Sequence, residues 1–100
     1  METLFRTVFG DTPKVRVLEF LLEGRELDYS ISDIAEGADI GRTTLFRIWD
    51  DLIAAKIIRP TRQIGNAKLY ILNRSNPFVQ KMIAAFDEII MPKKKVLASL

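Results

Sequence analysis

The side chains with the most evident chemistry in this sequence are basic, and they gather in one stretch. Residues 42–74 carry seven basic side chains against two acidic ones, whereas residues 1–41 carry four against nine. The seven are Arg42, Arg47, Lys56, Arg59, Arg62, Lys68 and Arg74. Guanidinium and ammonium groups bind phosphate oxygens and the acceptor atoms of bases. The charge distribution therefore indicates a polyanionic partner for this part of the chain.

Other chemistries are excluded by composition. The sequence contains no Cys and no His, which removes disulfides, thiol nucleophiles, imidazole bases and the usual zinc, copper and iron sites. The remaining Asp, Glu, Ser and Lys residues form no cluster at catalytic spacing. We therefore expect no catalytic residues, no cofactor, no metal and no enzymatic activity.

The overall composition is that of a soluble globular chain. Of its 100 residues, 48% are hydrophobic and 28% are charged, which fits a single domain over residues 1–100. No apolar run approaches the roughly 18 residues of a membrane span. The first residues lack the basic region and long apolar stretch of a signal peptide. We expect a cytoplasmic protein with no membrane partner.

The basic block opens with a segment whose apolar residues recur every three or four positions. This spacing predicts a helix over residues 42–55. Its inner face takes Leu45, Ile48, Trp49 and Leu52. Its outer face takes Thr43, Phe46, Arg47 and Asp50, with Arg42 projecting from the first turn. An alternative places Phe46 in the core, because Leu45 and Trp49 leave the edge of the inner face open.

Two further helices are predicted before this one, each from a capping signal. Thr12-Pro13 is a typical helix start, and the helix would run over Pro13–Glu23 and stop at Gly24. Its apolar rows face the core, and Arg16, Glu19 and Glu23 are left for solvent. Ser30 with Asp33 resembles a capping box that opens a short helix over residues 31–37. Residues 1–10 predict another short helix, with an apolar face of Leu4, Phe5, Val8 and Phe9, and residues 27–29 a short strand.

A β-hairpin follows the basic helix. Residues 57–64 and 67–72 flank Gly65-Asn66, a two-residue loop of the glycine-first type. This loop would pair Ile64 with Ala67, Arg62 with Leu69 and Pro60 with Ile71. Since Pro60 has no amide proton, its strand should form the edge of the sheet. Arg62 and Lys68 would lie near the tip.

A C-terminal helix is predicted from Asn76-Pro77 to about Met91, where Pro92 would end it. It carries a continuous apolar stripe made of Phe78, Val79, Met82, Ile83, Phe86, Ile89 and Ile90. This stripe either folds back on residues 1–9 or pairs with a second subunit, and we favour the second, which makes residues 76–91 a dimerisation helix. Residues 92–100, with Lys93-Lys94-Lys95, are interpreted as a solvated basic tail.

The order of these elements, together with the segments ISDIAEGADIGRTTLFRIWDDLIAAKIIR and RPTRQIGNAKLYIL, resembles the winged helix-turn-helix transcriptional regulators of the broad MarR and ArsR type. The resemblance covers about residues 12–74. Ala35 matches the small residue where the two helices of the motif cross, and Ile57-Ile58 matches the hydrophobic pair before the wing. Gly41 stands in place of a capping Ser or Thr, and Lys56 in place of a glycine. The many isoleucines are compatible with an archaeal source.

The resemblance implies a mainly α fold with a small antiparallel β-hairpin, a winged helix-turn-helix with an additional C-terminal helix. It also implies a homodimer that binds double-stranded DNA and regulates transcription. Helix 42–55 would enter the major groove, and the wing, residues 59–72, would contact the flanking backbone or minor groove. The expected DNA-binding residues are Arg42, Thr43, Thr44, Phe46, Arg47, Arg62 and Lys68.

Each role has a physical basis. Arg47 can contact guanine through two hydrogen bonds, and Phe46 can meet a thymine methyl group. Thr43 and Thr44 can bind phosphate. The alternative is a winged-helix module that binds protein in a transcription or other nucleoprotein assembly. A separate alternative for the basic residues is that Arg42 and Arg47 only solvate the helix face, and that Arg62 and Lys68 only solvate the hairpin tip. The sequence leaves any small-molecule effector, the operator and the direction of regulation open.

Overall fold

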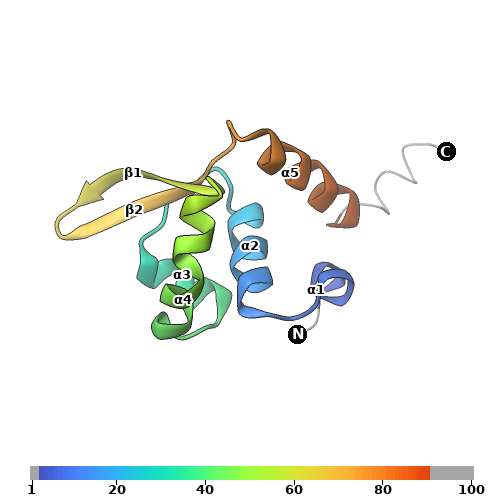
Figure 1. The fold of residues 1–100 in the computed structure, drawn as a ribbon, viewed down its shortest axis with the longest axis horizontal. Helices are drawn as coiled ribbons and strands as arrows, with labels where there is room; N and C mark the ends of the chain where they lie inside the picture. Colours follow the sequence, from blue (N-terminus) through green and yellow to red (C-terminus); the bar gives the residue numbers. More distant parts are fainter. Residues whose placement is uncertain (1–2, 91–100) are drawn as a thin grey trace.

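A computed structural model describes residues 3–90 of the chain. Four helices precede a hairpin, and one follows it (Figure 1): α1 (Leu4–Phe9), α2 (Pro13–Glu23), α3 (Ile31–Ala38), α4 (Arg42–Ala54), β1 (Ile58–Ile64), β2 (Ala67–Leu72) and α5 (Pro77–Ile90). The hairpin extends from one end of the molecule, and α1 and α5 lie together at the other end. Met91, Pro92 and the three lysines of the expected basic tail lie outside the described residues.

Helix α2 forms the centre of the core, as its wide apolar face predicted. The Thr12 hydroxyl accepts a hydrogen bond from the amide of Val15 at 3.2 Å, which confirms the predicted cap. The side chains of Val17 and Leu22 are fully buried, and α2 packs against α1, α3 and α4. The close approach of α3 requires a glycine, because a Cβ at Gly37 would lie 2.1 Å from the ring of Phe20.

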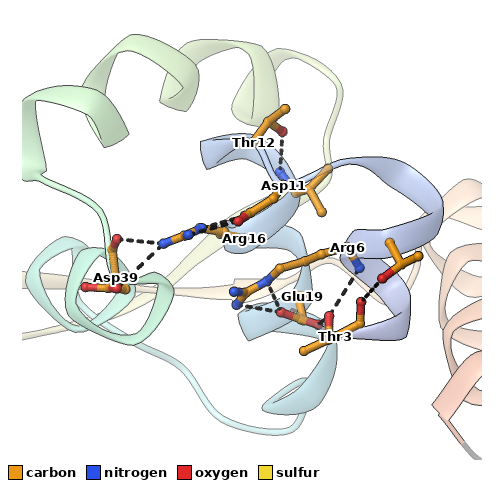
Figure 2. A network of polar contacts seen from close by, with 9 residues as sticks. Thr3, Arg6, Asp11, Thr12, Arg16, Glu19 and Asp39 are labelled. Atoms are coloured by element: carbon orange, nitrogen blue, oxygen red, sulfur yellow. Dashed lines mark hydrogen bonds and ion pairs between the residues drawn. The ribbon is translucent and has the colours of Figure 1, made fainter. Parts of the chain in front are cut away.

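Glu19 of α2 corrects the expectation that this residue faces solvent. It is only 2% exposed. Its carboxylate forms an ion pair with Arg6, whose Nη2 lies 2.7 Å away, and accepts a hydrogen bond from the Thr3 hydroxyl at 2.6 Å (Figure 2). Helix α1 covers this face of α2; Arg6 belongs to this helix, and Thr3 is the residue that caps its start. The helical period of α2 alone could not reveal this contact.

Arg16, the arginine of α2, connects two loops. Arg16 donates two hydrogen bonds to the Asp11 carboxylate and one to the backbone oxygen of Asp39, in the turn between α3 and α4 (Figure 2). Asp39 has a φ of 57°, in the left-handed region. The turn that sets the angle between α3 and α4 is therefore fastened to α2.

The helix-turn-helix segment follows the predicted local signals. The Ser30 hydroxyl accepts a hydrogen bond from the amide of Asp33, and the Asp33 carboxylate accepts one from the amide of Ser30, so the capping box is confirmed. Ala35 is buried where α3 packs against its neighbours. Helix α4 begins after Gly41, which provides no side-chain cap, and ends one residue earlier than predicted.

The hairpin has the predicted loop and a register that the sequence did not predict. Ile64 pairs with Ala67, as expected, but Pro60 pairs with Tyr70 rather than Ile71. The register shifts between Pro60 and Gln63, because β1 carries a β-bulge there. The expected strand over residues 27–29 is a single bridge between Tyr29 and Tyr70. β2 thus lies between Tyr29 and β1, which places Pro60 on an outer strand as predicted.

After the end of α4, the chain turns at Lys56, whose φ of 59° lies in the left-handed region. This is the position at which the resembled regulators have glycine. The side-chain amide of Asn73 donates a hydrogen bond to the Lys56 backbone oxygen at 2.9 Å, and that of Asn76 donates another at 3.0 Å. Asn76 also reaches the oxygen of Ala55 at 3.2 Å. The end of α4, the end of β2 and the start of α5 therefore meet at these carbonyls.

Candidate nucleic-acid interface

The outer face of α4 is the first component of the candidate site. The inner side chains of Leu45, Trp49 and Leu52 are buried and fix the rotation of the helix. Consequently the side chains of Arg42, Thr43, Phe46, Arg47 and Asp50 are exposed, and that of Thr44 is half-buried. Phe46 is 51% exposed, so the alternative that placed it in the core is wrong. The Arg42 guanidinium lies 6.0 Å from the centre of its ring, at the distance of a cation–π contact.

Two basic side chains, one on this face of α4 and one on the adjacent wing, are exposed and, within the described residues, unpaired. Within residues 3–90, the side chains of Arg47 and Lys68 form no ion pair and no hydrogen bond, whereas Lys14 is paired with Asp51 at 3.1 Å. Free and exposed cations attract phosphate through both Coulomb attraction and counterion release. The face is therefore suited to a polyanion.

A groove of about 460 Å³ separates the start of the helix-turn-helix from the hairpin. Arg42 lies on one side of it and Lys68 on the other, and Ser30, Ser32 and Asn66 also line it. These five residues offer two cations, two hydroxyls and an amide, which are donors of the kind that bind a sugar–phosphate backbone. Sequence reasoning missed Ser30, Ser32 and Asn66 as site residues. Ser30 was recognised only as a helix cap, and no spacing rule places it beside the hairpin loop.

Arg62, the other expected wing contact, has an acidic partner. Its Nε and Nη2 donate hydrogen bonds to the Asp28 carboxylate at 2.9 and 3.2 Å, and the Thr61 hydroxyl donates another at 2.7 Å. The Arg62 and Thr61 hydrogen bonds lower the pKa of Asp28 to about 2. The Arg62 side chain nevertheless stays 63% exposed. Arg62 is thus oriented by Asp28 and still open to solvent.

The expected dimerisation stripe of α5 divides into two groups. Val79 and Phe86 lie in the core of their own chain, where the rings of Phe86 and Phe5 are 5.4 Å apart in an edge-on contact. No partner could reach them in this conformation. Met82, Ile83 and Ile89 are half-buried, and Phe78 is 61% exposed. The side chain of Ile90 lies outside the described residues.

The end of the molecule formed by α1 and α5 is apolar at its surface. Leu4, Val8 and Phe9 of α1 are each more than half exposed, as is Phe78 of α5. An apolar cavity of about 390 Å³ opens between α1, α2 and α5 and is lined by Phe5, Phe9, Val15, Leu18, Phe78 and Met82, among others. Exposed apolar surface of this kind is typical of protein interfaces.

Two features are absent from residues 3–90. None of the helices in this range has the length and apolar character to cross a membrane. Within the same range, the acidic side chains do not gather into a group of three or more that could hold a metal ion.

The arrangement of α3 and α4 as a helix-turn-helix, followed by a β-hairpin beside it, defines a winged helix-turn-helix fold. No protein-family model matches the chain, and no curated protein matches it either. Among solved structures, it is similar to AntR, an antimony-specific transcriptional repressor, with a TM-score of 0.61, 22% identity and coverage of 92% of this chain and 78% of AntR.

Two other solved structures have the same fold. One is a variant of Lactococcus lactis ZitR in its apo form, with a TM-score of 0.63, 13% identity and coverage of 94% of this chain and 74% of ZitR. The other is Sso10a-2, a DNA-binding protein from Sulfolobus solfataricus, with a TM-score of 0.53, 18% identity and coverage of 85% of this chain and 93% of that protein. The predicted fold, a winged helix-turn-helix with a C-terminal helix, is confirmed.

Proposed function

We propose that this protein is a sequence-specific regulator of transcription that binds double-stranded DNA, with α4 in the major groove. The observation that carries this proposal is the set of three exposed basic side chains, Arg42, Arg47 and Lys68, which lie on α4 and the adjacent wing and form no ion pair within residues 3–90. AntR, a transcriptional repressor, and Sso10a-2, a DNA-binding protein, have the same fold and support the proposal. No catalytic role is proposed for any residue.

The outer face of α4 would read bases. Arg47 lies near the middle of the helix and would donate two hydrogen bonds to a guanine. Phe46, held by Arg42 on one side, would contact a thymine methyl group. Asp50 is one turn after Arg47 and would accept a hydrogen bond from a cytosine or orient the arginine. Thr43 and Thr44, in the first turn, would bind a phosphate oxygen.

The groove between α3, α4 and the wing would hold the sugar–phosphate backbone that borders the major groove. Arg42 and Lys68 would neutralise its charge from opposite sides, and the hydroxyls of Ser30 and Ser32 would add hydrogen bonds. Lys68 and Arg62 would extend this contact along the wing. In this arrangement the backbone contacts set the register in which α4 reads the bases.

We further propose that the protein acts as a homodimer formed through α1 and α5. The exposed side chains of Leu4, Val8, Phe9 and Phe78 would form the contact, since Val79 and Phe86 already lie in the core of their own chain. A two-fold dimer would place two copies of α4 in successive major grooves, about 34–36 Å apart. Each half-site is short, so pairing would supply the specificity that one subunit lacks.

The exposed ring of Phe46 and the exposed side chain of Ile53 favour a second candidate, a module that binds protein through α4. The two candidates differ in what they predict for nucleic acid. A protein-binding module would show neither a sequence preference on DNA nor a binding constant that falls steeply with salt.

Selection of bound sequences from a pool of random DNA duplexes tests the proposal directly. We expect enrichment of a palindrome whose two half-sites are about one helical turn apart. Binding to that site should weaken with salt, with a slope of about −0.9 in log affinity against log salt for each phosphate neutralised. Absence of binding at low salt would reject the DNA-binding function, and enrichment of a lone half-site would reject the dimer.

A further inference from the structure

We propose that Asp28 is a positioning residue for DNA recognition, which holds Arg62 so that its free N–H groups face a phosphate of the bound DNA. This inference rests on the proposed function, since it assigns one acidic residue of the same site a role in binding a polyanion. Its basis is the hydrogen-bonded cluster of Asp28, Thr61 and Arg62.

Asp28 is a rigid anchor because the next residue is part of the sheet. The amide of Tyr29 donates to the backbone oxygen of Tyr70, and the amide of Tyr70 donates to that of Tyr29, both at 2.8 Å. The backbone of Asp28 is therefore fixed relative to β2. Its side chain is only 17% exposed, so it has little freedom to rotate into solvent.

The bulge in β1 is what brings two adjacent side chains to this carboxylate. In a regular strand, successive side chains point to opposite faces, so Thr61 and Arg62 could not both reach the same group. Here the register shift leaves both residues opposite Leu69, since Pro60 pairs with Tyr70 and Gln63 with Lys68. Both then donate to Asp28. A β-bulge commonly redirects a side chain in this way.

After its hydrogen bonds to Asp28, Arg62 still has N–H donors that are not engaged. A guanidinium group has five N–H bonds, and Asp28 engages one on Nε and one on Nη2. The other three remain, on a side chain that is 63% exposed. Two hydrogen bonds also fix the plane of the guanidinium group, so the conformational entropy of this long side chain is lost before DNA binds.

For the change in DNA affinity on removal of Asp28, the proposal predicts the opposite direction to that expected from charge alone. Asp28 is a negative charge beside a surface that binds a polyanion, so on charge alone its removal should tighten DNA binding. If Asp28 positions Arg62, its removal should weaken binding instead, because Arg62 becomes mobile. The direction of the change therefore separates the two explanations.

The experiment measures affinity for the selected DNA site at several salt concentrations for the variants Asp28→Asn, Arg62→Gln and their combination. We expect each single variant to bind about tenfold more weakly, with a salt slope smaller by about one, and the combination to be no weaker than either. Arg62→Lys keeps the charge but not the paired donors, and we expect it to resemble Arg62→Gln. Glu26→Gln removes the same charge two residues before Asp28 and should not weaken binding.

A second readout does not depend on affinity. In the ¹H–¹⁵N NMR spectrum of the free protein, we expect a slowly exchanging Nε–H signal from Arg62 that shifts when DNA binds and is lost in Asp28→Asn. Thermal unfolding of each variant verifies that the fold is retained, and Arg62→Lys, at an exposed position, provides a variant that should fold in any case.

The possible results are distinct. If the unmodified protein fails to bind any duplex, the proposed function fails and this inference with it. If the unmodified protein binds, but Asp28→Asn binds as tightly or more tightly, then the function stands and Asp28 has no positioning role. Additive losses in the combined variant would likewise overturn the inference, because they would show that the two residues act separately.

Discussion

The buried ion pair between Glu19 and Arg6 provides a strong test of how α1 is held. Helix α1 has six residues, which is too short to be stable in isolation. It depends on contacts with the rest of the chain, chiefly this ion pair and the packing of Phe5 against Phe86. Glu19→Ala removes the carboxylate that pairs with Arg6 and accepts the hydrogen bond from Thr3.

The expected loss follows from the burial of the two partners. Removing one member of a fully buried ion pair costs about 3–5 kcal/mol. The Glu19 side chain is 3% exposed and that of Arg6 17%, so Arg6 can recover part of its hydration once α1 loosens. We therefore expect Glu19→Ala to lower the free energy of unfolding by about 2–3 kcal/mol, below the range for two fully buried charges.

Urea unfolding followed by circular dichroism measures this loss. With a slope of about 1–3 kcal/mol per molar urea for small proteins, the midpoint should fall by roughly 0.7–3 M. Glu23→Ala, one turn further along α2 and exposed, is the matched control and should change stability by less than about 0.5 kcal/mol. Equal losses in the two variants would show that the ion pair does not hold α1, and would refute the reasoning.

Three further predictions concern the site, the apolar end and pH. Arg47→Ala should cost about 1–3 kcal/mol on the selected DNA site and relax the preference at one base pair, whereas Lys68→Ala should weaken binding to all sequences alike; titrations with selected and scrambled duplexes distinguish the two, and identical behaviour would contradict the assignment of Arg47 to the groove. Phe86→Asp should unfold the chain, because Phe86 is 4% exposed, whereas Phe78→Asp should keep the fold and yield monomers in sedimentation; a Phe78→Asp dimer would disprove the proposed contact. The pKa of Asp28 is lowered to about 2, below the usual value of about 3.9, so its stabilising contribution is present above about pH 4 and is lost progressively as the pH falls from there through about 2. An NMR titration of its carboxyl carbon with a midpoint near pH 4 would show that Arg62 and Thr61 do not bind it in solution.

The features that could be predicted from the sequence are local ones. The faces of α4 follow from the spacing of Leu45, Trp49 and Leu52, because burial of that row fixes the rotation of the helix. The caps at Thr12 and Ser30 depend on residues three positions away in the chain. Signals of this range are visible in a sequence, and they were sufficient to identify the fold and the exposed basic residues of the candidate site.

The features that were missed depend on contacts between distant segments. The burial of Glu19 requires α1, which lies 13 residues away at Arg6. The partner of Arg62 lies 34 residues before it, and the bulge that permits this contact has no marker in the hairpin sequence. The burial of Phe86 follows from the packing of α5 on α1. Hydrophobic spacing shows that a face is buried, but it does not show whether the same chain or another one covers it.

The junction at Lys56 has a mechanical consequence. The side-chain amides of Asn73 and Asn76 donate to the backbone oxygens at the end of α4, and Asn76 also precedes α5, where its side-chain oxygen accepts a hydrogen bond from the amide of Phe78. A rigid-body tilt of α5 would therefore also displace the end of α4, so the movements of the two helices are coupled. The two amide side chains add to the backbone hydrogen bond from Asn73 to the oxygen of Ile57 at this junction, so their replacement by alanine would let the two ends of the molecule move more independently.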